Sequence, residues 1–178
     1  MVNVLTLVTG GVCSGKSALA ESLCSFDEAV TYVATGPQRD DVDWIERIAV
    51  HQQRRPSSWR TVETDDVAAV LSQTQGPMLV DCLGTWLTGR LDALEAWDVP
   101  RSDWRVHLLE KYDVVVQSLK NRIATTVLVT NEVGWSVVPA HRSSRIFVDE
   151  LGRLNQQVAQ VCDCVLLAVA GCSVVVKQ

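Results

Sequence analysis

Residues 4–17 read VLTLVTGGVCSGKS, and they decide the fold of the chain. The apolar run 4–8 predicts a short buried strand, and the residues from Ser17 onward have the composition of a helix. Between them the pattern G-x-x-x-x-G-K-[ST] begins at Gly10 and is complete at Ser17. A strand, a glycine-rich loop and a helix in this order are typical of a phosphate-binding loop, or P-loop.

Each residue type in this loop has a physical task. Glycines let the backbone curl so that its N–H groups face a phosphate, and the following helix N-terminus favours the anion. The Lys16 ammonium is expected to contact the β- and γ-phosphates, and the Ser17 hydroxyl to ligate Mg²⁺. A glycine-rich turn without a ligand is the disfavoured alternative. The predicted nucleotide contacts here are Gly10, Gly11, Val12, Cys13, Ser14, Gly15, Lys16 and Ser17.

The composition is that of an ordinary globular chain. With 178 residues, 47% apolar and 21% charged, it is expected to form a single domain over residues 1–178. The net charge of −5 argues against a general nucleic-acid binder. The sequence shows no membrane-spanning run and no basic region before its first apolar stretch, so we expect a cytoplasmic protein. The six cysteines lack a C-x-x-C pair and are expected to be mainly small core residues.

Short apolar runs alternate with amphipathic stretches along the rest of the chain. The runs at 29–34, 59–63, 78–81 and 125–130 predict strands, and 165–170 with 174–176 predict a hairpin. Helical spacing predicts helices over 40–51, 65–71, 102–123 and 141–161. Strands that alternate with helices indicate an α/β fold of the P-loop NTPase type. We expect a mostly parallel sheet with helices on both faces and a C-terminal antiparallel hairpin.

Residues 84–101 contain two glycines and a proline, which predict an irregular segment. Within it Trp86 and Trp97 are expected to be exposed. Such a segment would suit a lid or a wall of a substrate site.

Two further features lie where parallel sheets bind ligands, at the carboxyl ends of strands. The strand 78–81 ends in Asp81, the form of a Walker B element whose acid meets Mg²⁺. The loop 131–139 follows another buried strand. Together with the P-loop, these features predict a Mg²⁺-dependent nucleotide-binding protein.

One histidine stands in an unusual setting. His51 directly precedes Gln52-Gln-Arg-Arg55 and Pro56. A nucleophilic histidine must be neutral when it attacks, which nearby guanidinium groups favour, and it needs cations that hold the attacked phosphate. The alternative is a helix end whose cations complement the helix dipole. His107 and His141 lack this setting and are assigned to surface or structural roles.

The motifs together resemble a known enzyme family. Beyond the P-loop, the segments that carry the resemblance are Tyr32-Val-Ala-Thr35, Arg47-Ile-Ala-Val-His51, Arg55-Pro-Ser-Ser-Trp-Arg-Thr61 with Glu63, Val129-Thr-Asn-Glu-Val-Gly134 and Gly152-Arg-Leu-Asn-Gln156. With them, the sequence resembles nearly end to end the bifunctional adenosylcobinamide kinase / adenosylcobinamide-phosphate guanylyltransferase family of cobalamin biosynthesis.

This resemblance implies two reactions. A nucleoside triphosphate, ATP or GTP, phosphorylates the aminopropanol hydroxyl of adenosylcobinamide. GTP then transfers GMP to a histidine, which maps onto His51, and the phosphorylated corrinoid takes the GMP to give adenosylcobinamide-GDP. The resemblance also implies a homotrimer or a related homo-oligomer. Its nucleotide-contacting positions outside the P-loop map onto Thr35, Gly36, Gln52, Gln53, Arg54, Arg55, Glu63 and Thr85.

The chain departs from the family pattern in two places. Val12-Cys13 replaces Ala-Arg of the usual loop G-G-A-R-S-G-K-S, and Gln52-Gln-Arg replaces Lys-Asp-Gly before Arg55. These changes leave open which nucleotide is the preferred phosphoryl donor.

Two other functions fit part of the same pattern. A small-molecule kinase without the guanylyltransferase step would use the P-loop and Asp81 alone. A nucleotide-gated binding module would bind GTP with Mg²⁺ and turn nothing over. Only the bifunctional enzyme also uses the His51 cluster.

Overall fold

The computed structural model describes residues 4–24, 29–36 and 55–178. Each strand expected from the sequence is present, whereas the expected helix over 40–51 lies outside the described residues. The described elements are β1 (Leu5–Gly10), α1 (Lys16–Ser22), β2 (Thr31–Ala34), β3 (Arg60–Glu63), α3 (Val67–Gln73), β4 (Met78–Asp81), α4 (Leu83–Ala93), α5 (Arg101–Lys120), β5 (Thr126–Val129), α6 (Arg142–Val161), β6 (Cys164–Val169) and β7 (Cys172–Lys177).

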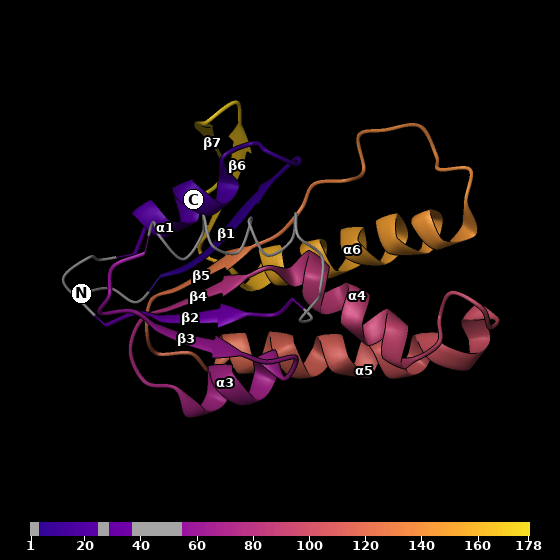
Figure 1. Ribbon diagram of the computed structural model, residues 1–178, viewed down its shortest axis with the longest axis horizontal. Coiled ribbons are helices and arrows are strands. Elements are labelled where there is room, and N and C mark those ends of the chain that lie inside the picture. The colour runs from indigo at the N-terminus through magenta and orange to yellow at the C-terminus, as the bar shows by residue number, and fades with distance from the viewer. Residues whose placement is uncertain (1–3, 25–28, 37–54) are drawn as a thin grey trace.

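The strands form one seven-stranded sheet in the order β3-β2-β4-β5-β1-β6-β7. All pairs from β3 to β6 are parallel, and β7 is antiparallel to β6. Helix α1 lies on one face, and α3, α4, α5 and α6 lie on the other (Figure 1). The predicted α/β architecture and the C-terminal hairpin are therefore confirmed.

Alternate residues of the central strands point to opposite faces, as strand geometry requires. Leu7 and Val80 pack with the helices α3 to α6, whereas their neighbours Val8 and Leu79 pack with α1. Because both faces are covered, a central strand is apolar at nearly every position. This explains why the runs were readable as strands from the sequence.

The prediction of an irregular segment over 84–101 is wrong over residues 84–93, whereas residues 94–100 lie outside helices and strands as predicted. Residues 83–93 form α4, and Trp86 is a core residue with only 3% of its surface exposed. Trp97 is partly buried. Two glycines cost the helix about 1 kcal/mol each. Burial of a large apolar side chain stabilises by about 1.5–3 kcal/mol, which outweighs this cost. The large buried side chains of α4 are Leu83, Trp86, Leu87 and Leu91.

Helices α5 and α6 are each 20 residues long. Tyr112, Val116 and Leu119 of α5 are buried, whereas Ile123, the last residue of the helix predicted over 102–123, is 81% exposed. Ile123 is exposed because α5 ends earlier, at Lys120. In the part of the chain that the structure describes, none of the helices combines the length and apolar character needed to cross a bilayer.

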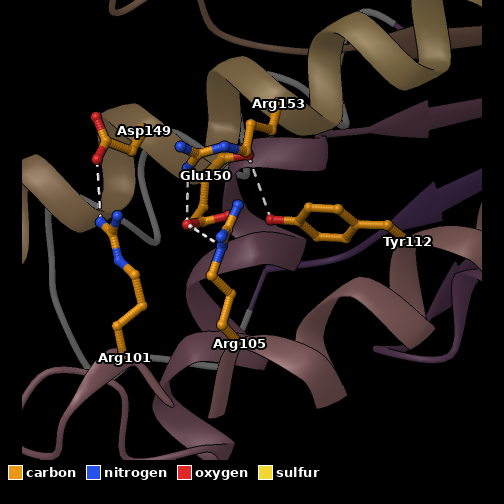
Figure 2. A network of polar contacts seen from close by, with 6 residues as sticks. All are labelled: Arg101, Arg105, Tyr112, Asp149, Glu150 and Arg153. Atoms are coloured by element: carbon orange, nitrogen blue, oxygen red, sulfur yellow. Dashed lines mark hydrogen bonds and ion pairs between the residues drawn. The ribbon is translucent and has the colours of Figure 1, made fainter. Parts of the chain in front are cut away.

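A polar network joins α5 to α6 around Glu150 (Figure 2). The Glu150 side chain is fully buried, and its Oε1 lies 2.9 Å from Arg153 Nη1 and 3.4 Å from Arg105 Nε. The Tyr112 hydroxyl donates to the Glu150 carbonyl oxygen at 3.3 Å. A buried carboxylate needs such partners, because desolvation of an unpaired charge is costly.

We expect Glu150→Gln to lower the free energy of unfolding by about 1–3 kcal/mol, since it removes a buried charge from two arginines that remain. The matched control is Asp149→Asn on the adjacent position. Asp149 pairs with Arg101 at 3.0 Å at the surface, so its loss should cost less than about 1 kcal/mol. Urea unfolding of both variants measures the difference. Equal effects would contradict the assigned role of Glu150.

Candidate nucleotide-binding site

The phosphate loop follows β1 and ends in α1. Lys16 opens α1, and its Nζ donates to the Gly11 carbonyl oxygen at 3.0 Å, so the ammonium group lies over the loop. Only 7% of the Lys16 surface is exposed. Cys13 and Gly15 have φ values of 57° and 92°. Left-handed residues within such a loop turn successive N–H groups to one side, which forms an anion-binding concavity.

Two glycines of the loop are required by close packing against the C-terminal hairpin. A Cβ atom on Gly10 would lie 2.7 Å from the Ala168 carbonyl oxygen, and one on Gly15 would lie 3.1 Å from Gly171 Cα. The Gly171 N–H donates to the Ser14 carbonyl oxygen at 2.9 Å. The phosphate loop therefore packs against β6 and the turn between β6 and β7, and a backbone hydrogen bond from this turn stabilises it.

The sheet register brings further predicted residues to the same edge. Ala34 pairs with Glu63 of β3 and with Asp81 of β4, so Thr35 and Gly36 follow β2 at the height of both carboxylates. Asp81 pairs in turn with Val129 of β5, which is the neighbour of β1. The carboxyl ends of parallel strands are where α/β sheets bind ligands.

Thr35 and Thr85 meet at this edge, although α4 and β2 are far apart in the sequence. Their hydroxyl oxygens lie 2.7 Å apart, and they lie 2.7 and 2.9 Å from the Cys82 carbonyl oxygen. Burial and the charge of Asp81 raise the pKa of the Cys82 thiol, which therefore stays neutral. Two of the predicted nucleotide-binding residues thus form one hydroxyl pair at the start of α4.

Tyr32 is a member of this edge to which sequence reasoning gave no role. Its hydroxyl donates to Asp81 Oδ2 at 3.0 Å, and the Arg55 guanidinium lies 3.4 Å from its ring centroid. Burial, with the charge of Asp81 as the second cause, raises the pKa of Tyr32, so the hydroxyl keeps its proton and remains a donor. Tyr32 therefore links Asp81 to Arg55, the residue that follows Arg54.

Tyr32→Phe is expected to keep the fold and to raise the Mg²⁺ concentration for half-maximal phosphoryl transfer about tenfold, because outer partners orient metal-binding carboxylates. The control is Tyr112→Phe, which removes a hydroxyl that contacts the Glu150 carbonyl instead. Initial rates against Mg²⁺ concentration measure both. Identical Mg²⁺ curves for wild type and Tyr32→Phe would refute the link.

The donor set near the loop fits Mg²⁺. Ser17 lies in the first turn of α1, which contacts β4, the strand that ends in Asp81. Within residues 4–24, 29–36 and 55–178, no three His, Cys, Asp or Glu side chains are grouped to hold a metal. One carboxylate and one hydroxyl beside a phosphate cradle match Mg²⁺, which usually keeps waters and binds substrate phosphates.

The loop after β5 is held by a second residue that sequence reasoning did not single out. Asn155 of α6 accepts from the Thr130 hydroxyl at 2.6 Å and donates to the Asn131 carbonyl oxygen at 3.0 Å. In the sequence, Asn155 belongs to the segment 152–156, which carried the family resemblance but had no assigned role. This bridge fixes the direction in which the chain leaves β5 beside the phosphate loop.

The structure places the remaining predicted residues as follows. Val12 and Cys13 are exposed in the loop, Gly36 is partly buried, and Glu63 is exposed at the end of β3. His107 and His141 lie at the surface, as expected. Cys24 and Cys162 are buried core residues, but Cys172 is exposed, so the core reading of the cysteines outside the phosphate loop holds only in part. Four of the predicted site residues lie outside the described ranges: His51, Gln52, Gln53 and Arg54.

Similarity to known proteins identifies the family of the chain. Residues 6–176 match the model of the cobinamide kinase / cobinamide phosphate guanyltransferase family. The chain belongs to this family. It is 35% identical over 98% of its length to the whole of the bifunctional adenosylcobalamin biosynthesis protein CobU of Salmonella typhimurium. The protein CobP of Pseudomonas aeruginosa, which carries the same description, is 42% identical over 93% of this chain and 92% of its own.

Solved structures show that the fold of this family member is shared more widely. A prototypical ATPase of a bacterial type III secretion system aligns with a TM-score of 0.59 at 11% identity, over 93% of this chain and 52% of the ATPase chain. The PH0250 protein of Pyrococcus horikoshii OT3 aligns with a TM-score of 0.54 at 9% identity, over 99% of this chain and 87% of its own. At such low identity the likeness concerns the fold alone.

Proposed function

We propose that the protein is a bifunctional enzyme of cobalamin biosynthesis. It phosphorylates adenosylcobinamide with a nucleoside triphosphate and then transfers GMP from GTP to the product, giving adenosylcobinamide-GDP. The observation that carries the proposal is the family match over residues 6–176, which includes both the phosphate loop and His51. A single domain would perform both steps.

In the kinase step, the acceptor hydroxyl oxygen forms a bond to the γ-phosphorus while the bond from that phosphorus to the β,γ-bridging oxygen breaks. The nucleoside diphosphate leaves, and the hydroxyl proton passes to solvent. The loop N–H groups hold the phosphates, and the Lys16 ammonium offsets charge that develops on the transferred group. When bound, Mg²⁺ would supply further charge neutralisation, held by Ser17 and Asp81.

In the guanylyltransferase step, we assign the nucleophile to His51. A neutral imidazole nitrogen bonds to the α-phosphorus of GTP, and pyrophosphate leaves. The phosphate oxygen of the corrinoid then displaces the histidine to form the diphosphate bridge. Arg54 and Arg55 are assigned to the α-phosphate, and the described Arg55 is held against the Tyr32 ring at the edge of the site. We assign the hydroxyl pair of Thr35 and Thr85 to nucleotide contact.

The test uses the purified protein and three substrates in sequence. With ATP and adenosylcobinamide it is expected to form adenosylcobinamide phosphate. Adding GTP should then release one pyrophosphate for each adenosylcobinamide-GDP formed. A protein that lacks the second activity would stop at the phosphate, and a nucleotide-gated binding module would form neither product. Either result would overturn the proposal.

Two aspects extend the proposal beyond the reaction. We expect a homo-oligomer, a trimer or a related assembly, and a cytoplasmic location. Strand β7 at the sheet edge exposes Val174, Val175 and Val176, an apolar surface that an oligomer contact would cover. Sedimentation analysis measures the assembly directly.

A further inference from the structure

A pocket of about 850 Å³ lies beyond the carboxyl end of β5. Its walls are formed by α4, by Trp97 after α4, by the segment that follows β5 and by the first turns of α6. The volume is in the range of sites that bind small molecules. Neither reaction step described above assigns a role to this pocket.

The pocket is continuous with the nucleotide edge through two elements. Glu132, which lines it, donates its backbone N–H to the Gly10 carbonyl oxygen of the phosphate loop at 3.0 Å. Thr88, which also lines it, lies one turn of α4 beyond Thr85 of the hydroxyl pair. The pocket therefore shares two of its walls with the sheet edge at which the phosphate loop lies.

The lining has a particular chemistry. Trp97, Trp135 and Phe147 provide broad aromatic surfaces, and hydroxyl groups such as those of Thr88 and Ser144 lie among them. The only charged residue among the described ones that line it is Glu132. Without a lysine or arginine, the pocket is unsuited to a second phosphate. It suits a large, partly apolar molecule that carries amide groups, which pair with hydroxyls.

One wall of the pocket is fixed and the other is exposed. Arg142 of α6 donates to the carbonyl oxygens of Ala96 at 3.2 Å and Val99 at 2.5 Å, which ties the segment around Trp97 to α6. On the opposite side, Trp135 is 77% exposed. A broad aromatic side chain left this open is a large apolar surface available to a ligand.

We propose that this pocket binds the corrinoid acceptor, with the macrocycle against Trp97 and Trp135 and its amide side chains on the hydroxyl groups. The aminopropanol arm then reaches toward the phosphate loop. This inference rests on the proposed function, because the acceptor is the cobinamide for which the family is named. The pocket assignment adds the residues that would select the acceptor, because the nucleotide site does not explain how the acceptor is recognised.

The test compares Trp135→Ala with Val137→Ala. Val137 lies in the same loop and is 91% exposed, but it does not line the pocket. Three quantities are measured for each variant and wild type: binding of adenosylcobinamide by equilibrium dialysis, KM for adenosylcobinamide in the kinase reaction, and protein labelling by α-labelled GTP without corrinoid. We expect Trp135→Ala to weaken binding and raise KM roughly tenfold, the scale of one anchor residue. Labelling should stay at the wild-type level, and Val137→Ala should match wild type throughout.

The outcomes separate this inference from the proposed function. If Trp135→Ala shows normal catalysis, an unchanged KM and unchanged binding of adenosylcobinamide in dialysis, the pocket assignment is overturned and the proposed function stands. Dialysis binding that depends on Trp135, in a protein without either activity, would support the pocket and overturn the function. Equal losses in Trp135→Ala and Val137→Ala would also count against the pocket, because they would report the loop as a whole. Absence of cobinamide binding by wild type would overturn both.

Discussion

Lys16→Ala is expected to lower the rate of phosphoryl transfer by roughly 10²–10³-fold, the effect of removing one preorganised donor from a developing charge. The Lys16 ammonium lies over the loop, bonded to the Gly11 carbonyl oxygen at 3.0 Å. Single-turnover transfer from labelled ATP to adenosylcobinamide measures the loss.

The control for this variant is Lys111→Ala, which removes an exposed lysine of α5. It should leave the rate unchanged. The far-ultraviolet circular dichroism of Lys16→Ala should equal that of wild type, since the lysine faces the phosphate site and not the apolar core. A wild-type rate in a folded Lys16→Ala protein would refute the kinase site.

His51→Ala is expected to abolish labelling of the protein by α-labelled GTP while phosphorylation of adenosylcobinamide continues. The wild-type label should be acid-labile and base-stable, as a phosphoramidate is. The matched controls are His107→Ala and His141→Ala, which alter surface histidines and should keep the label. Label that persists in His51→Ala would remove His51 from the mechanism.

The same reaction has an expected pH dependence. Attack requires the neutral imidazole, and an unperturbed histidine has a pKa of about 6.5. The rate should therefore be full above this pKa and should be lost as the pH falls through it. A labelling rate that is constant between about pH 5 and 8 would argue against an imidazole nucleophile.

Much of the fold could be predicted because its central strands are buried on both faces. Such strands are apolar at nearly every position, so the runs at 78–81 and 125–130 were readable without knowledge of their neighbours. Helix α4 was missed because Gly84 and Gly89 were read as breakers. The spacing of Leu83, Trp86 and Leu87 was the better signal, since tertiary burial outweighs local propensity.

The contacts within the candidate site were predictable only where its residues are contiguous. The phosphate loop carries its own geometry, whereas the contacts of Thr35 with Thr85 and of Tyr32 with Asp81 depend on β2 lying beside β4. Strand β3 separates them in the sequence but lies on the outer side of β2. The spacing of residues in the sequence does not reveal the order of the strands in the sheet. The hydrogen-bond partner of Asp81 could therefore be identified only from the structure.

The brace between the β6–β7 turn and the phosphate loop has a consequence for synthesis. The loop is translated early, but the Gly171 N–H that holds the Ser14 carbonyl oxygen belongs to a turn translated much later. Strand β6, which flanks β1 and packs against Gly10, is made with it. On the ribosome, a nascent chain that has exposed the phosphate motif still lacks its support. The hydrogen bond between the Gly171 N–H and the Ser14 carbonyl oxygen can thus form only after residue 171 has emerged.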